Sequence, residues 1–262
     1  PAWLPGTAVI LALLLVAACR SSEYPALPGI PDELRAIPKA LEGLNLPELS
    51  GIALPGIDEL GVLAAPPGAV VFAGPTAPQL AAGERLAGTD ITFVGVEGED
   101  AVFEIGGLRS PRRMGDALDF DGSWPGLEGS TYATRLRIYG FTADGAWLAG
   151  VQKLLIPDVA PVRGPVPAGA VTLHFPFADG VRIGAGDTIS GTTLGYLGKF
   201  ERGAQLEGLP DNEYPYRKAG DSIVWSGALR PGAGITYDLR TLTYGRESLR
   251  VGGTVAVTLP TR

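Results

Sequence analysis

The feature that most constrains the fold is an internal repeat in the part of the chain that follows residue 65. The segment AAGERLAGTDITFVG (81–95) matches GAGDTISGTTLGYLG (184–198) at an offset of 103, with five identical residues. Further along, 115–140 aligns without a gap on 220–245 at an offset of 105, and nine of the 26 pairs are identical. Two steady offsets over most of a domain indicate a tandem duplication, so the chain has to build one fold twice.

The ends of the repeat set the expected domain boundaries. Both copies open on Pro-x-Gly-Ala-Val, at 66–70 and at 167–171. We therefore predict one domain at 66–160 and a second at 161–262. Each has about 95 residues, which is a normal size for a single domain.

The pattern within each copy is typical of short strands. Alternate positions near the C-terminus are apolar, as expected for one face of a strand: Leu249, Val251, Val255, Val257 and Leu259. Turn residues interrupt the pattern every 8 to 12 positions, and no amphipathic pattern longer than ten residues follows residue 65. These features predict an all-β protein with two antiparallel β-sandwich domains, immunoglobulin-like in the loose architectural sense. A small barrel is the alternative.

Composition excludes several classes of function. The chain has one Cys, one His and a formal net charge of -7. It cannot form an internal disulfide or a Cys/His metal cluster, and an acidic surface disfavours nucleic acid as a partner. We predict no cofactor and no metal. His174 stands alone in an apolar stretch, and no G-x-S-x-G motif accompanies it, so we interpret it as a strand residue and expect no enzyme activity.

The N-terminus has the pattern of an export signal. Residues 8–18 form an apolar run that is too short to span a bilayer, and it ends at Cys19. The stretch Val16-Ala17-Ala18-Cys19 resembles the lipobox of bacterial lipoproteins. The resemblance covers only the leader and implies cleavage after residue 18 and lipidation of Cys19. It also implies membrane anchoring in the cell envelope, and the Arg after the Cys favours the outer membrane or cell surface.

Residues 19–65 are rich in Pro and Leu, and similar pieces recur in them, LPGIPDEL at 27–34 and LPGIDEL at 54–60. We interpret 19–65 as a semi-stiff tether that holds the folded part away from the membrane. The alternative is an amphipathic segment that docks on the fold or on a partner.

Two patterns with acidic residues are candidates for a binding site. Asp119 and Asp121 fit two positions of a calcium loop that ends at Glu128, but a principal ligand is missing and the second copy lacks the pair. They are better explained as solvent-facing strand residues. Asp116 and Arg135 recur as Asp221 and Arg240, and we interpret both pairs as structural, with each Asp in a Gly-Asp turn.

The loops that differ between the copies are the candidate binding surface. The second copy carries four extra residues before its Gly-Asp turn, in a segment that contains Tyr214, Tyr216 and Arg217. In the first copy Trp124 lies in the loop Gly-Ser-Trp-Pro-Gly. Rigid aromatic residues and Arg are common in recognition surfaces. We predict a non-enzymatic structural or protein-binding role. The alternative is binding of cell-wall polysaccharide through these aromatic residues.

Overall fold

The computed structural model describes residues 52–169 and 171–260, without the side chains of 178–181. Every strand pair in this part is antiparallel, so the prediction of an all-β chain of antiparallel sheets is confirmed. The predicted signal peptide, Cys19 and most of the 19–65 segment lie outside the described residues.

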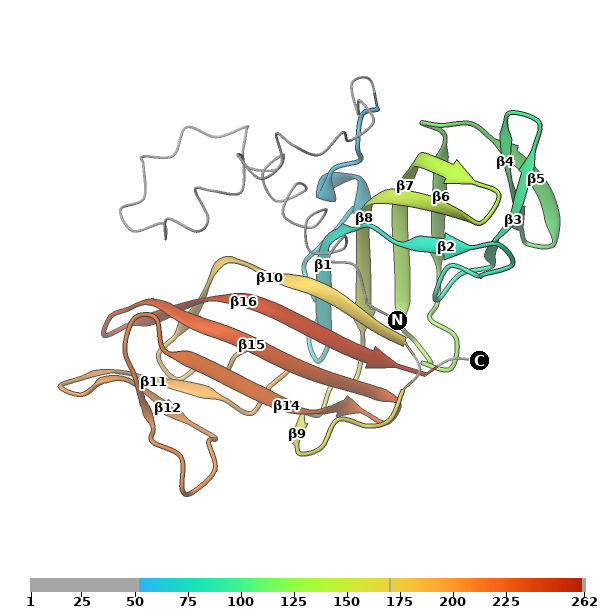
Figure 1. The fold of residues 1–262 in the computed structure, drawn as a ribbon. Coiled ribbons are helices and arrows are strands. Elements are labelled where there is room, and N and C mark those ends of the chain that lie inside the picture. The colour runs from blue at the N-terminus through green and yellow to red at the C-terminus, as the bar shows by residue number, and fades with distance from the viewer. Residues whose placement is uncertain (1–51, 170, 261–262) are drawn as a thin grey trace.

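Half 1, residues 66–160, contains a large sheet and a small one (Figure 1). The large sheet has the order β1-β8-β7-β6, and β2 also pairs with β8. Its strands are β1 (Val70–Thr76), β2 (Gln79–Ala81), β6 (Ala117–Gly122), β7 (Thr131–Thr142) and β8 (Gly145–Ile156). The small sheet has the order β3 (Ile91–Glu97), β4 (Asp100–Ile105) and β5 (Leu108–Arg112).

Half 2, residues 161–260, has a similar strand order, with one further strand at the edge of its large sheet. Its large sheet runs β10-β16-β15-β14-β9 and its small sheet runs β11-β12-β13. The large-sheet strands are β9 (Val162–Arg163), β10 (Val171–Gly184), β14 (Ser222–Arg230), β15 (Ala233–Tyr244) and β16 (Ser248–Leu259). The small sheet consists of β11 (Gly195–Phe200), β12 (Gly203–Glu207) and β13 (Tyr216–Arg217).

The turn that precedes each small sheet is held by the same hydrogen bonds in both halves. The hydroxyl of Thr89 donates to the carbonyl of Leu86 at 2.9 Å, and that of Thr192 donates to the carbonyl of Ile189 at 2.8 Å. The same two hydroxyls accept the backbone N–H groups of Ile91 and Leu194, at 3.1 and 3.0 Å. These threonines are buried, so satisfying their hydroxyls inside the turn fixes the backbone there.

Strand pairing corrects the gapless alignment of 115–140 on 220–245. Gly122 pairs with Tyr132, whereas the matching Gly227 pairs with Ile235. The chain between the paired residues is therefore two residues longer in half 1 than in half 2. The identical residues on these strands consequently occupy different places, and the structural equivalent of Arg240 is Arg137 rather than Arg135.

The two large sheets pack against each other as well as against their own small sheets. One apolar cluster lies between the small and large sheets of half 1 and includes Phe93, Phe103, Leu136 and Leu148. A larger cluster fills the corresponding space in half 2 and continues between the halves. In Figure 1 the long strands of the two halves cross, and the small sheets lie at opposite ends of the molecule. The halves thus share a hydrophobic core.

The junction between the halves is closed by two matched hydrogen bonds. The indole Nε1 of Trp124 donates to the carbonyl of Pro260 at 3.0 Å. A guanidinium nitrogen of Arg230 donates to the carbonyl of Pro157, also at 3.0 Å. Pro157 and Pro260 follow the last residues of β8 and β16, so each half binds the end of the other half's central strand.

The short 3-10 helix η2 (Ile57–Leu60) packs on the outer face of the half 1 sheet. Its Leu60 is buried beside Ala133 and Val151. The ammonium of Lys153 donates to the carbonyl of Leu60 and, at 3.4 Å, to that of Val62. The described end of the 19–65 segment therefore packs on the fold.

Candidate recognition surface of half 2

The four extra residues of half 2 lie in a loop between β12 and β13. In half 1 the strand β5 pairs with β4 over five residues, from Leu108 to Arg112. In half 2 only the last two positions pair, Tyr216 with Gln205 and Arg217 with Ala204. The segment from Gly208 to Tyr214 therefore leaves the sheet edge, and the carbonyl of Pro215 accepts the N–H of Leu206 at 2.8 Å where the chain returns to it. We refer to residues 208–215 as the candidate recognition loop, or recognition loop for short.

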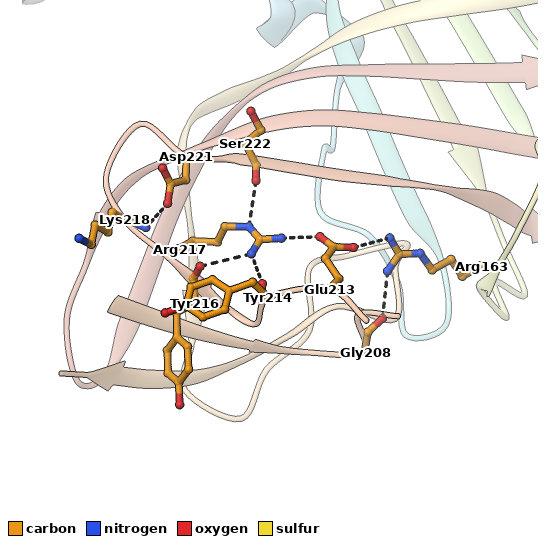
Figure 2. A network of polar contacts seen from close by, with 9 residues as sticks. All are labelled: Arg163, Gly208, Glu213, Tyr214, Tyr216, Arg217, Lys218, Asp221 and Ser222. Atoms are coloured by element: carbon orange, nitrogen blue, oxygen red, sulfur yellow. Dashed lines mark hydrogen bonds and ion pairs between the residues drawn. The ribbon is translucent and has the colours of Figure 1, made fainter. Parts of the chain in front are cut away.

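Arg217 braces this loop from the inside (Figure 2). The residue is 9% exposed and its Nε donates to the carbonyl of Ser222 at 3.0 Å. One terminal nitrogen donates to the carbonyls of Tyr214 and Tyr216, the latter at 3.3 Å. Protein acceptors take the place of water around a buried guanidinium. The guanidinium therefore holds the backbone that provides those acceptors in place.

An acidic residue links the brace to the rest of half 2. The carboxylate of Glu213 forms ion pairs with Arg217 and, at 3.4 Å, with Arg163 of β9. Arg163 also donates to the carbonyl of Gly208 at 3.3 Å, where the loop begins. At the other end, the N–H of Lys218 donates to the carboxylate of Asp221 at 2.7 Å. Charged side chains thus hold the start of the loop to β9, and the chain turns at Asp221 just beyond the loop's end.

The braced loop presents aromatic side chains to solvent. Tyr214 is 58% exposed, Phe200 of β11 is 48% exposed, and Tyr216 is half-buried between them. The Tyr214 and Tyr216 rings lie 5.5 Å apart at an angle of 57°, and Phe200 meets Tyr216 edge-on at 6.4 Å. The guanidinium of Arg202 stands 5.9 Å from the centre of the Tyr216 ring. We refer to Phe200, Arg202, Tyr214 and Tyr216 as the aromatic patch.

Half 1 has different chemistry at the same positions. Strand pairing matches Phe200 with Glu97, and Tyr216 with Pro111. Arg109 forms an exposed ion pair with Glu97 across this edge. The aromatic patch is therefore a property of half 2 alone and is not required by the shared fold.

The structure brings together three of the four predicted site residues. Tyr214, Tyr216 and Arg217 lie in one loop, but Arg217 is buried and supports the surface instead of forming it. Trp124 is 2% exposed at the junction of the halves, so its prediction as an exposed binding residue is wrong. It is buried because its ring packs edge-on against Tyr132, with centroids 5.0 Å apart, while Pro260 accepts its N–H.

Phe200 and Arg202 are not among the residues predicted from the sequence. They belong to a part of the second copy that aligns with the first at an offset of 103, where their partners are Glu97 and Glu99. The change from acid to aromatic and from acid to base at two nearby surface positions was the available signal. Neither position interrupts the strand pattern, so neither stands out in one copy alone.

The remaining candidates have structural roles. Asp119 and Asp121 lie on β6 and pair with Arg137 at 3.3 Å and with Arg135 at 2.9 Å, as expected of solvent-facing strand residues. Asp116 accepts the N–H of Arg113 at 2.8 Å, which matches the turn at Asp221. His174 is an exposed residue of β10.

Within residues 52–169 and 171–260, no group of three or more His, Cys, Asp or Glu residues is placed to hold a metal ion. The same ranges contain no helix of the length and apolarity that crossing a membrane requires. No family model, curated protein or solved structure matches the chain.

Proposed function

We propose that the protein is a lipid-anchored, non-enzymatic component of a bacterial cell envelope that binds a partner protein through the aromatic patch of half 2. The leader and Cys19 supply the anchor by resemblance to lipoproteins. Two duplicated, immunoglobulin-like β-sandwiches form the body that carries the patch. The observation that carries the binding proposal is the buried brace at Arg217, which holds exposed aromatic side chains in a fixed arrangement.

The brace favours binding because it lowers the entropic cost of recognition. Exposed aromatic residues in a mobile loop lose conformational freedom on binding, whereas those in a fixed loop have lost it on folding. Arg217 donates to the carbonyl of Tyr214 and to the carboxylate of Glu213 in the loop, and to the carbonyls of Tyr216 and Ser222 on β13 and β14, so it ties the loop to these strands. Tyr214 and Phe200 are exposed and both pack on Tyr216, and a group of exposed aromatic side chains is typical of a binding surface.

The ring geometry favours a protein over a polysaccharide. Successive sugar units stack on aromatic faces that lie in one plane, but these rings are inclined by 57° and 71° to each other. Inclined rings with a nearby guanidinium suit interdigitation with the side chains of a protein. Carbohydrate binding is the second candidate, because an exposed aromatic residue such as Tyr214 also suits contact with a single sugar unit.

Site-specific photo-crosslinking in the native cells tests the binding surface. A photoreactive phenylalanine at position 214 should give one defined adduct with another envelope protein. The same residue at Leu108, 75% exposed at the matching edge of half 1, should give none. Phe200→Ser should weaken the adduct. Equal labelling from both positions, or none, would contradict the proposal, and glycan-array binding that Tyr214→Ala abolishes would favour the second candidate.

The anchor is tested separately by metabolic labelling with an alkyne fatty acid. The wild-type protein should carry the label and sediment with membranes. Cys19→Ser should lose the label and leave the membrane fraction. Label that persists in the Ser variant would rule out lipidation at this residue without affecting the proposed binding surface.

A further inference from the structure

A pocket of about 170 Å³ lies in half 1 close to the junction with half 2. Its floor is formed by buried residues of β7 and β8, namely Tyr132, Thr134, Leu136 and Gln152. Leu173 of half 2 closes one side. Its rim contains the exposed residues Gln79, Glu84 and Arg85, so the pocket is accessible from solvent.

The floor carries a polar group without a partner. Thr134 is 1% exposed, and its hydroxyl forms no hydrogen bond within the described part of the chain. Its neighbours are satisfied: the Tyr132 hydroxyl donates to Gln152 at 3.2 Å, and the Gln152 amide donates to the carbonyl of His174 at 3.2 Å. A buried hydroxyl without a partner is costly, so a ligand that bonds to Thr134 would remove that cost.

Half 2 fills the equivalent space with aromatic rings. Thr134 pairs with Phe120 and Gln152, and the matching residue Tyr237 pairs with Trp225 and Val255. Thr76 pairs with Gly150, and its match Phe177 pairs with Gly253.

In half 2 the rings of Phe177 and Tyr237 meet edge-on at 5.5 Å. The Tyr237 hydroxyl donates to the carbonyl of Ser190 at 2.6 Å. At the matching positions half 1 has two threonines, and both line the pocket. Half 2 thus shows that the fold accommodates an aromatic ring between its two sheets at the position of Thr134.

We propose that the half 1 pocket binds a phenol ring, with Thr134 as hydrogen-bond partner of the ring's hydroxyl. The volume suits a single ring, because an engineered cavity of about 150 Å³ binds benzene. Leu80, Leu86, Leu136 and Leu173 supply apolar contacts for the ring. Larger ligands are excluded by the size of the pocket, which is below the roughly 300 Å³ typical of drug-sized sites.

Titration of the folded protein with p-cresol, followed by calorimetry and ligand-observed NMR, tests this site. We expect saturable binding with a Kd of about 1 mM or tighter, given the few atoms that such a ligand brings. Thr134→Val removes only the hydroxyl and should weaken binding about two- to tenfold, the effect of one neutral hydrogen bond. Thr134→Phe places a ring in the pocket and should abolish binding.

The blocking residue is Phe and not Tyr for a structural reason. Gly191 lies against the Tyr237 hydroxyl in half 2, whereas the matching Gly88 already lies against the ring of Trp124. Thr241→Val is the matched control, because Thr241 is equally buried and its hydroxyl also lacks a partner, yet it does not line the pocket. It should bind p-cresol as the wild type does.

The two sources of a phenol ring are separated by a second ligand. Binding of p-cresol but not of N-acetyltyrosinamide would assign the pocket to a free small phenol. Comparable binding of both would assign it to a tyrosine side chain of a peptide. The proposal fails if the wild type binds neither at millimolar concentration, if glucose binds better than p-cresol, or if Thr134→Phe, shown to be folded, binds as well as the wild type.

Discussion

The two halves share a framework but differ in the side chains that it carries. The strand order and the threonine turns before the small sheets recur almost without change. At matched positions, however, half 1 has a pocket where half 2 has Phe177 and Tyr237. Turn hydrogen bonds and strand pairing therefore set the fold of both halves, whereas the side chains on this framework differ between them.

The largest effect is expected when a buried residue of half 2 is replaced by the residue that half 1 has at the matching position. Tyr237→Thr should lower the free energy of unfolding by about 3 to 5 kcal/mol, because it removes a fully buried ring and leaves a cavity. Urea denaturation followed by circular dichroism measures the change. The reverse change, Thr134→Phe, should cost much less, because a pocket already exists there. Equal losses for the two variants would show that the pocket does not accommodate a ring.

The second comparison concerns Arg217 and its match Arg112, which pair with equivalent alanines of the small sheets. Arg217→Ala should cost about 2 kcal/mol, since it removes charged hydrogen bonds to several carbonyls and unpairs Glu213 from its closest cation.

Arg112→Ala should cost under about 1 kcal/mol, because the Nε of Arg112 has no partner in the described structure. Thermal unfolding and hydrogen exchange of the 208–215 backbone measure both variants. If the two arginines proved equivalent in both measurements, the brace would have no special role in the recognition loop.

Much of the framework could be predicted from the sequence because it depends on local signals. Alternating apolar residues such as Leu249 and Val251 face one side of β16, and the Gly-Asp turn at Asp221 accepts a backbone N–H three residues away. Such features involve residues close together in the chain, so a single pattern contains them.

The rest depends on contacts between distant residues. Trp124 is buried because Pro260, 136 positions later, accepts its N–H. An apolar face in the sequence predicts burial but not which element covers it, so the core shared by the halves was not foreseen. The gapless alignment also matched Tyr132 with Tyr237, although the structural match of Tyr237 is Thr134. A shift of two residues along a strand keeps the same face, so the apolar pattern does not reveal it.

A third test uses pH to compare the buried tyrosines of the two halves. Desolvation raises the pKa of Tyr132 in half 1 and of Tyr237 in half 2 well above the usual value. In the unfolded chain both ionise near pH 10, so the unfolded state loses its protons first. The contribution of these two tyrosines to stability should therefore be constant below about pH 10 and fall above it, by about 1.4 kcal/mol per pH unit for each tyrosine.

Denaturation at pH 8 and pH 11 measures this loss. Tyr132→Phe and Tyr237→Phe each lack one ionisable group, so each should lose about 1.4 kcal/mol less than the wild type over this interval. Each variant is compared with itself at pH 8, which separates ionisation from the lost hydrogen bond. An undiminished loss in either variant would mean that the corresponding hydroxyl is not buried in solution.

The smallest effects should come from the part of the framework that the halves have in common. Asp116 and Asp221 accept the N–H of the residue three positions earlier, at 2.8 and 2.7 Å, and both are exposed. Asp116→Ala and Asp221→Ala should each lower stability by about 0.5 kcal/mol, the low end for one hydrogen bond because water can replace the carboxylate.

Equality is the informative result for this pair, and chemical denaturation of both variants beside the wild type measures it. If the halves share one core, both turns unfold in the same cooperative transition. The two variants should then lose the same free energy of unfolding within error. A markedly larger loss at Asp221 would mean that this turn also supports the recognition loop, since Lys218 follows Arg217 directly. The framework would then have diverged along with its side chains, and the difference between the halves would extend to the backbone turns.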